Sequence, residues 1–189
     1  GIYVTAGGVD VVNNGTSGSI DIKGDTVGIY AANNFSISTS SSGNTTVTAV
    51  DSTSAGVSPG GHRSGIDVSG LTLTNTGSGN LNVTGTSQTV IGLKVINDVL
   101  ARNSGNGTIN LAGDLTWAGN TAVAIGGNMS VVNNGTSGAV TILGASQYAL
   151  GSVFSIAGQL NISSTSSGNT SVTGVGTDTS YATSSYNDG

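Results

Sequence analysis

Pairs of apolar residues separated by a single residue recur along the whole chain at nearly constant spacing, and this periodicity limits the folds open to it. Apolar residues at every second position mark one face of a β-strand. Each unit contains three pairs. The second starts six residues after the first (seven in the first unit), and the third starts eight or nine residues beyond the end of the second. The six opening pairs begin at Ile2, Ile29, Ile66, Leu93, Val123 and Phe154.

A longer repeat encloses these units. The segment VVNNGTSG occurs at residues 11–18 and again at residues 131–138, and SSGNT occurs at residues 41–45 and 166–170. The chain is therefore duplicated at a distance of about 120 to 125 residues. Internal repetition on both scales is typical of a protein built by stacking similar units.

Three short strands per unit predict an all-β fold, a right-handed parallel β-helix of about six triangular coils. A β-sandwich would not repeat its strand spacing in this way, and the GGxGxDxUx repeat of calcium-binding β-rolls is missing from the sequence. Residues 1–189 are expected to form one β-helix segment of a longer repetitive protein. Within it, residues 51–64 are expected to form a loop insertion and residues 175–189 an irregular C-terminal tail.

The position after the second strand of each unit is polar, although it follows an apolar pair. An asparagine side chain can both donate and accept hydrogen bonds, so stacked copies predict a ladder that closes the turns. The glycines that follow, such as Gly77 and Gly105, are expected to supply backbone conformations with positive φ. The predicted ladder consists of Asn13, Thr39, Asn75, Asn103, Asn133 and Ser164.

Two stretches carry a family resemblance, LTLTNTGSGNLNVTG at residues 71–85 and LNISSTSSGNTSVTG at residues 160–174. With their asparagine ladder and near absence of charge, they resemble the passenger β-helix of filamentous-haemagglutinin-type exoproteins. Those proteins are large Gram-negative adhesins exported by two-partner secretion or as autotransporters. The resemblance covers essentially the whole chain.

This resemblance implies a non-enzymatic shaft or adhesive segment of a secreted or surface-displayed bacterial adhesin, acting in attachment or biofilm contact. It implies two kinds of partner: an outer-membrane secretion partner, and a receptor or glycan on a host or bacterial surface. It implies no cofactor.

Composition excludes several other functions. Gly, Ser, Thr and Asn make up 104 of the 189 residues, only 7% of residues are charged, and the net charge is −5. This balance argues against nucleic-acid binding, which requires basic residues. The chain contains no cysteine for a disulfide or a thiolate metal site, and no apolar run long enough to predict a transmembrane segment.

Two alternative functions stay open at this stage. One is a carbohydrate-active β-helix, such as a polysaccharide lyase or depolymerase, which needs acids gathered across neighbouring coils. Asp25, Asp51 and Asp114 lie at similar offsets within their units, so they are the acids that such a cluster would use. The other alternative is a self-associating matrix or filament protein.

The insertion is the first place to look for a binding site, because loops that project from a solenoid often carry binding residues. It contains Asp51, the only proline (Pro59), the only histidine (His62) and Arg63. Trp117, in the fourth unit, is a further candidate because its ring can stack on a sugar. A single histidine without cysteines predicts no metal site.

Overall fold

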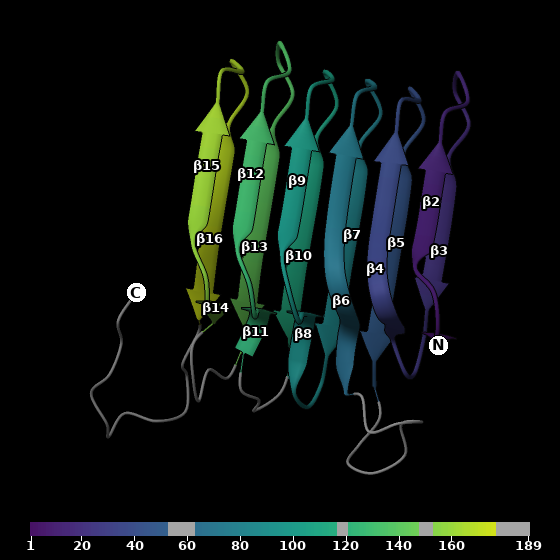
Figure 1. Cartoon of the computed structure of the whole chain (residues 1–189), viewed down its shortest axis with the longest axis vertical. Helices are drawn as coiled ribbons and strands as arrows, with labels where there is room; N and C mark the ends of the chain where they lie inside the picture. The colour runs from purple at the N-terminus through teal and green to yellow at the C-terminus, as the bar shows by residue number, and fades with distance from the viewer. Residues whose placement is uncertain (53–62, 117–120, 148–152, 177–189) are drawn as a thin grey trace.

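The computed structural model describes residues 1–52, 63–116, 121–147 and 153–176. Every regular element in these residues is a β-strand, and the strands form three stacks (Figure 1). The first stack contains β1 (Ile2–Val4), the first parts of β4 (Ile29–Thr39) and β6 (Ser64–Asn75), β8 (Ile91–Val95), β11 (Thr121–Ile125) and β14 (Phe154–Ile156). The second contains β2 (Val9–Asn13), the last parts of β4 and β6, β9 (Val99–Asn103), β12 (Met129–Asn133) and β15 (Leu160–Ser164). The third contains β3 (Ile20–Gly24), β5 (Thr45–Asp51), β7 (Leu81–Ser87), β10 (Ile109–Leu115), β13 (Val140–Ser146) and β16 (Thr170–Gly176).

The strands within each stack pair in parallel, and their register follows the sequence repeat. Ile2 pairs with Ile29, which pairs with Ile66, and the column continues through Leu93, Val123 and Phe154. The predicted β-helix is therefore confirmed as a parallel β-solenoid of about five turns, close to the six coils expected. Below, coils one to six are numbered by these opening residues.

Two coils differ from the prediction of three separate strands. In coils two and three, the first and second strands are continuous as β4 and β6, and their pairing shifts register between Ala31 and Asn34. Asn33 and Asn34 are exposed at this shift, so the chain still turns a corner there without ending the strand.

The interior of the solenoid is filled by columns of like residues. One column contains Phe35, Leu71, Val99 and Met129, and all four side chains are buried. Burial of apolar area along these columns is the main stabilising term for a fold whose single coils have no core of their own.

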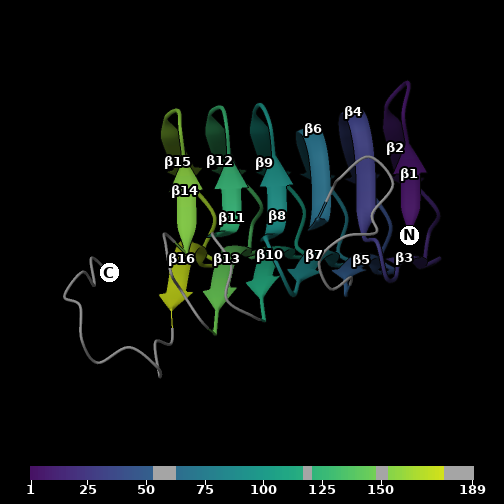
Figure 2. The same ribbon diagram turned by 90° about the horizontal axis from the view of Figure 1, so that it is seen from below.

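The third stack packs closely against the first stack, and small residues allow this approach (Figure 2). Gly85 and Gly113 occupy one inward column of the third stack. A Cβ atom at Gly85 would collide with the carbonyl oxygen of Gly92, and one at Gly113 with that of Ala122. The backbones of the third and first stacks are therefore in contact along this edge of the solenoid.

The polar corner residues lie in one column at the C-terminal ends of the second strands. The turns that follow them line up along the top of Figure 1. Each asparagine Nδ2 donates to a glycine carbonyl of its own turn. These bonds are Asn13 to Gly18 at 2.9 Å, Asn75 to Gly79 at 3.1 Å, Asn103 to Gly107 at 3.0 Å and Asn133 to Gly138 at 2.9 Å.

Contacts between neighbouring coils complete this column. Asn103 Nδ2 also donates to Asn133 Oδ1 at 3.2 Å, and Thr39 Oγ1 donates to the carbonyl of Asn13 at 3.2 Å. In coil six, Ser164 Oγ accepts from Thr170 Oγ1 at 3.2 Å. Each asparagine Nδ2 thus donates once within its own turn and once to the following coil, and among the described residues only the bond from Asn103 to Asn133 joins two corner side chains directly.

The predicted role of the turn glycines is wrong. Positive φ among the described residues occurs at Gly7, Gly28 and Thr26, and not at Gly77 or Gly105. A Cβ atom at Gly105 would instead collide with the carbonyl oxygen of Gly77 in the preceding coil. Glycine is needed there because stacked turns approach closely, and not because of an unusual dihedral angle.

The segment boundaries differ slightly from those expected. Asp51 is the last residue of β5 and Ser64 the first of β6, so the insertion begins after Asp51. Residues 53–62 of it lie outside the described residues. Val175 and Gly176 belong to β16 because they pair with Ala145 and Ser146, and residues 177–189 of the expected tail lie outside the described residues.

Removing the amide of Asn75 should destabilise the solenoid. Asn75→Ala leaves the Gly79 carbonyl and the Gly77 N–H, which Asn75 Oδ1 accepts at 3.1 Å, without side-chain partners. We expect the free energy of unfolding, measured by urea titration, to fall by about 1–3 kcal/mol. Asn106→Ala is the matched control, because Asn106 is exposed in a neighbouring turn. An equal loss in both variants would contradict the role of Asn75.

Alanine substitutions distinguish close stacking from backbone conformation. Gly105→Ala should cost about 1–3 kcal/mol of unfolding free energy through overpacking. Gly18→Ala should leave stability unchanged or raise it by about 0.4–1 kcal/mol, because nothing lies within 4 Å of a Cβ at Gly18. Thermal melts of the two variants compare them directly. Similar losses at both positions would argue against the stacking explanation.

Candidate functional site

The structure describes two of the five residues proposed as binding candidates. Asp51 is buried at the inward-facing end of β5, opposite Ser87, so its side chain belongs to the interior. Arg63 is partly buried, and its carbonyl accepts a hydrogen bond from Ser87 Oγ at 3.0 Å. Pro59, His62 and Trp117 lie outside the described residues.

The three acids considered for a catalytic cluster do not share a site. Asp114 occupies the same register column as Thr86 and Val50, one position before the column of Asp51. Because successive side chains of a strand point to opposite faces, Asp114 and Asp51 face opposite sides of the sheet. Asp25 follows β3, in the first coil. Similar offsets in the sequence do not bring these acids together, because a difference of one position reverses the face of the sheet.

An open groove of about 530 Å³ lies at the corner between the first and second stacks, and we call it the corner groove. Its position follows from a second polar column, formed by the residues that directly precede each second strand. The groove is lined by Asn34, Ser69, Gly70, Leu71, Thr72, Asn97, Asp98, Val99, Leu100, Asn128 and Ser130.

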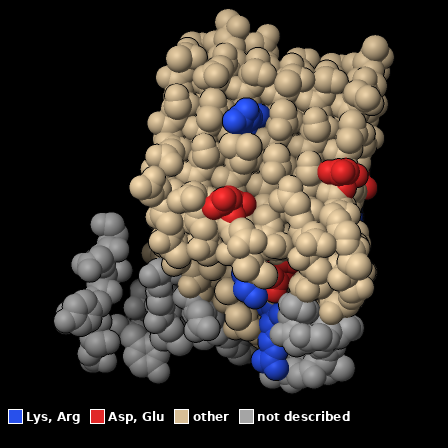
Figure 3. All heavy atoms as spheres, viewed as in Figure 1, with Lys and Arg blue, Asp and Glu red and all other residues tan. Residues whose placement is uncertain are grey.

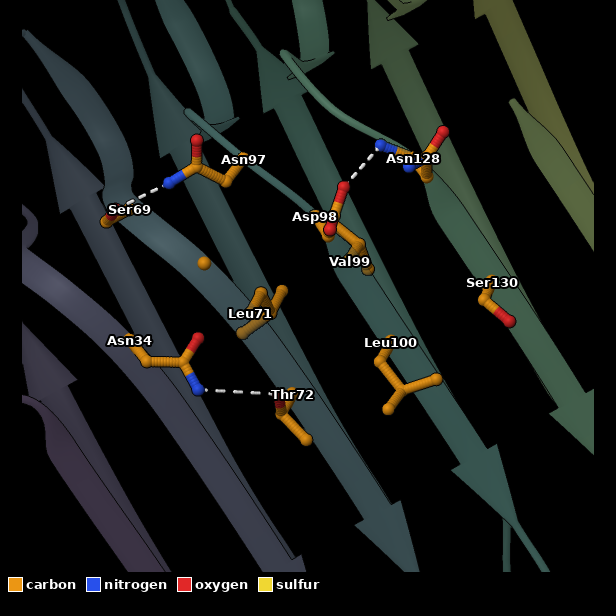
Figure 4. A pocket seen from close by; sticks show the side chains of 11 residues that line it. Asn34, Ser69, Leu71, Thr72, Asn97, Asp98, Val99, Leu100, Asn128 and Ser130 are labelled. Atoms are coloured by element: carbon orange, nitrogen blue, oxygen red, sulfur yellow. Dashed lines mark hydrogen bonds between the residues drawn. The ribbon is translucent and has the colours of Figure 1, made fainter. Parts of the chain in front are cut away.

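Hydrogen bonds between coils fix the polar side chains of the corner groove (Figure 4). Asp98 Oδ1 accepts from the backbone N–H of Asn128 at 2.7 Å, and Asn128 Oδ1 accepts from that of Gln159 at 2.9 Å. Asn97 Nδ2 donates to Ser69 Oγ at 2.9 Å. Each side chain is thus held by the neighbouring coil, which reduces the entropy it can lose on binding a ligand.

Gly70 interrupts this second column. It pairs with Asn34 and occupies the position that Asp98 and Asn128 hold in the next coils. The Asn34 side chain lies over Gly70, and its Nδ2 donates to Thr72 Oγ1 at 3.4 Å, as Figure 4 shows. The absence of a side chain at Gly70 makes room for the amide oxygen of Asn34, with which a Cβ atom at this position would collide.

The corner groove is polar and nearly neutral. Asp98 is the only ionisable residue in its lining, and the remaining polar groups are amides and hydroxyls. The face drawn in Figure 3 carries few charged side chains: those on its upper part are isolated by neutral surface, and positive and negative groups lie side by side on its lower part. Such a surface offers hydrogen bonds without a strong electrostatic field.

A second group lies on the outward side of the first stack, in the column that contains Tyr3, Tyr30, Asp67 and Lys94. The rings of Tyr3 and Tyr30 stack with centroids 4.7 Å apart. Lys94 Nζ lies 3.1 Å from Asp67 Oδ2, and the Asp67 side chain is only 2% exposed whereas that of Lys94 is 38% exposed. Of the two ion pairs described, Lys94–Asp67 and Lys23–Asp21, the pair in this column has the more deeply buried acid.

Sequence reasoning missed both columns, although a signal was present. Asn34, Asp98 and Asn128 each stand directly before a second apolar pair, and Tyr3, Tyr30, Asp67 and Lys94 are each the middle residue of an opening pair. Aligning the units by their apolar pairs and reading the intervening polar positions would have found them.

Comparison with known proteins gives no relative. No family model, no curated protein and no solved structure matches this chain. Among the described residues, no helix is long and apolar enough to cross a membrane, and no three metal-ligating side chains come together.

Burial raises the pKa of Asp114 above its ordinary value of 3.8, against a smaller lowering by a backbone hydrogen bond from Leu115. The folded state therefore favours the protonated carboxyl. This contribution to stability is complete below pH 3.8 and is lost as the pH rises through the raised pKa.

Asp114→Asn should consequently be more stable than the parent chain at pH 7, by at most about 1 kcal/mol because the site is partly solvated. The difference should vanish below pH 3.8. Melting temperatures measured across this pH range test the prediction. Asp10→Asn, at an exposed position, controls for the change in net charge. A gain at pH 7 that persists unchanged at low pH would contradict it.

Proposed function

We propose that the chain is a non-enzymatic adhesive segment of a secreted or surface-displayed bacterial protein, and that the corner groove binds a glycan. The observation that carries this proposal is the lining of the groove. It combines amides and hydroxyls held by neighbouring coils with apolar surface from Leu100, which is only partly buried. Sugars present hydroxyls beside apolar C–H faces, so this combination fits them.

The atoms left over after the internal hydrogen bonds fit the same ligand. Asp98 uses Oδ1 to accept the N–H of Asn128, which leaves Oδ2 to accept a hydrogen bond from a sugar hydroxyl. Asn128 uses Oδ1 towards Gln159, which leaves Nδ2 to donate one. Hydroxyl groups both donate and accept, so a sugar can satisfy both.

The solenoid scaffold supports a role in attachment. Stacked coils form a continuous, rod-like unit that can present a site away from a surface. The resemblance to filamentous-haemagglutinin-type exoproteins adds the expected route: export through an outer-membrane partner by two-partner secretion or as an autotransporter. These parts of the proposal rest on the resemblance and on the solenoid.

An adhesive role is preferred to a carbohydrate-active enzyme because of the acids. Glycoside cleavage by general acid–base chemistry uses two carboxyl groups that flank the bond. Asp98 is the one acid in the lining of the corner groove, and its Oδ1 is occupied by a structural hydrogen bond. The groove thus fits binding without turnover.

A glycan array and a cell-binding assay test the proposal. Ser130→Tyr should fill the corner groove and abolish binding, whereas Thr141→Tyr on the outer face of the third stack should not. Asp98→Asn keeps the oxygen that accepts the Asn128 N–H but changes the second position from an acceptor to a donor. We expect it to weaken binding about tenfold, at unchanged melting temperature.

Replacing residues 53–62 with a short Gly-Ser turn, which keeps Asp51 of β5 and Ser64 of β6, separates the insertion from the corner groove. Binding that survives this replacement and is lost in Ser130→Tyr supports the groove. Binding lost only with the insertion would move the site to coil two. Release of reducing sugar ends by the parent chain would contradict a non-enzymatic role. No binding by the parent chain would contradict the glycan site and indicate that the segment is a spacer.

A further inference from the structure

The corner groove runs along the axis of the solenoid. Its lining comes from residue 34 of coil two, residues 69–72 of coil three, residues 97–100 of coil four, and residues 128 and 130 of coil five. Each of these coils pairs with a neighbour on both sides. Paired strands are about 4.8 Å apart, so the lining extends about 14 Å along the axis.

The lining repeats from coil to coil. Coils three, four and five each contribute the residue directly before the second strand and the first outward residue of that strand. These outward residues are Thr72, Leu100 and Ser130, which are neighbours in register. Figure 4 shows them one after another across neighbouring strands. A ligand that makes equivalent contacts in each coil must therefore itself repeat at about 4.8 Å.

A linear glycan has such a repeat. A pyranose ring that is linked through equatorial positions on opposite sides advances its chain by nearly the same distance. An extended peptide repeats its side chains every two residues, at about 6.6–6.8 Å, so it would fall out of step with the coils. Equatorially linked rings also carry hydroxyls along both edges beside flat C–H faces.

Successive coils offer the groups that such a chain needs. Thr72 Oγ1 accepts from Asn34 Nδ2 at 3.4 Å, which leaves its own O–H to donate. Leu100 presents apolar surface in the next coil, where a ring face can pack. In coil five, Asn128 adds its Nδ2 and Ser130 adds a half-buried hydroxyl.

Asp98 determines which charge the ligand can carry. It is exposed, and it is the one charged residue among the described residues of the lining. Arg102 lies further along β9 and outside the lining. A carboxylate or sulfate on a sugar bound in coil four would therefore meet a like charge with no cation of the lining to pair with it.

We propose that the corner groove binds a neutral, linear glycan of equatorially linked sugars, which lies along the solenoid axis with about one sugar per coil, and that Asp98 rejects acidic glycans. This inference rests on the proposed function and specifies its ligand. About four sugars fill the groove, one for each coil that lines it. The competing arrangement is recognition of a terminal sugar alone, which would use one or two coils.

The dependence of affinity on glycan length tests the axial arrangement. Isothermal titration calorimetry of the full chain compares cello-oligosaccharides and N-acetylated chito-oligosaccharides of two to six residues. In at least one series, the dissociation constant should fall at least about tenfold between two and four residues and then stay constant. Malto-oligosaccharides are the control series, because their axial linkage curves the chain. They should bind at least about tenfold more weakly.

Substitutions in different coils test whether one ligand spans them. Thr72→Val and Ser130→Ala remove hydroxyls that lie two coils apart. Each should weaken binding of the tetrasaccharide about fivefold. Thr74→Val is the matched control, because Thr74 is the next outward residue of β6 and lies outside the lining. It should bind like the parent chain, and thermal melts check that all three variants fold.

The same oligosaccharides oxidised to a carboxylate at the sixth carbon test the role of Asp98. The parent chain should bind the neutral tetrasaccharide at least about tenfold more tightly than the oxidised one. Asp98→Asn should reduce this preference to about threefold or less, because it removes the like charge and keeps the oxygen that accepts the Asn128 N–H.

The outcomes separate this inference from the proposed function. Equal affinity for two and four residues, or no binding of either neutral series while another glycan on the array binds in the groove, would overturn the axial arrangement alone. Acidic chains that bind as tightly as neutral ones would overturn the role of Asp98. Glycan binding that Ser130→Tyr leaves unchanged, or no glycan binding at all, would overturn both the inference and the proposed glycan site.

Discussion

Register between successive coils is the constraint on which the structure depends. Parallel backbone pairing places each residue beside the residue at the same position of the next coil, so an inward side chain contacts its own equivalent. The buried columns therefore accept like residues, and a polar group inside must be satisfied in every coil where it occurs. Asn75 and Asn133 meet this demand: Nδ2 of each donates to a carbonyl of its own turn, and Oδ1 of each accepts a hydrogen bond.

The same constraint leaves the outward positions free to differ. The outer column that contains Tyr30, Asp67 and Lys94 changes chemistry from coil to coil, whereas the inward residues on either side of it stay apolar. The corner groove arises in this way: Gly70 replaces the asparagine or aspartate of the neighbouring coils without disturbing the pairing of Leu71 with Val99. Variation on the outside, over a fixed interior, is how a repeated scaffold acquires a local site.

The sequence predicted what depends on periodicity. The opening residues Ile29 and Ile66 and the corner residues Asn75 and Asn103 pair as their spacing implied. Prediction from the sequence failed for residues whose role depends on contacts between coils. Gly105 looked like a residue of unusual φ, yet it is a point of close approach, and Asp51 looked like part of a loop, yet it is buried. The corner groove is visible only when the columns are assembled in space, because its lining residues come from several coils.

The stacking direction also determines how the molecule responds to force. Backbone hydrogen bonds between coils run along the axis of the rod, so tension applied at the two ends loads the last coil first and leaves the others paired. The coils would detach one after another. With successive units 27 to 37 residues apart, each detachment releases on the order of 90 Å or more of extended chain. A tether built from such coils lengthens in steps under shear and holds its attachment while it does so.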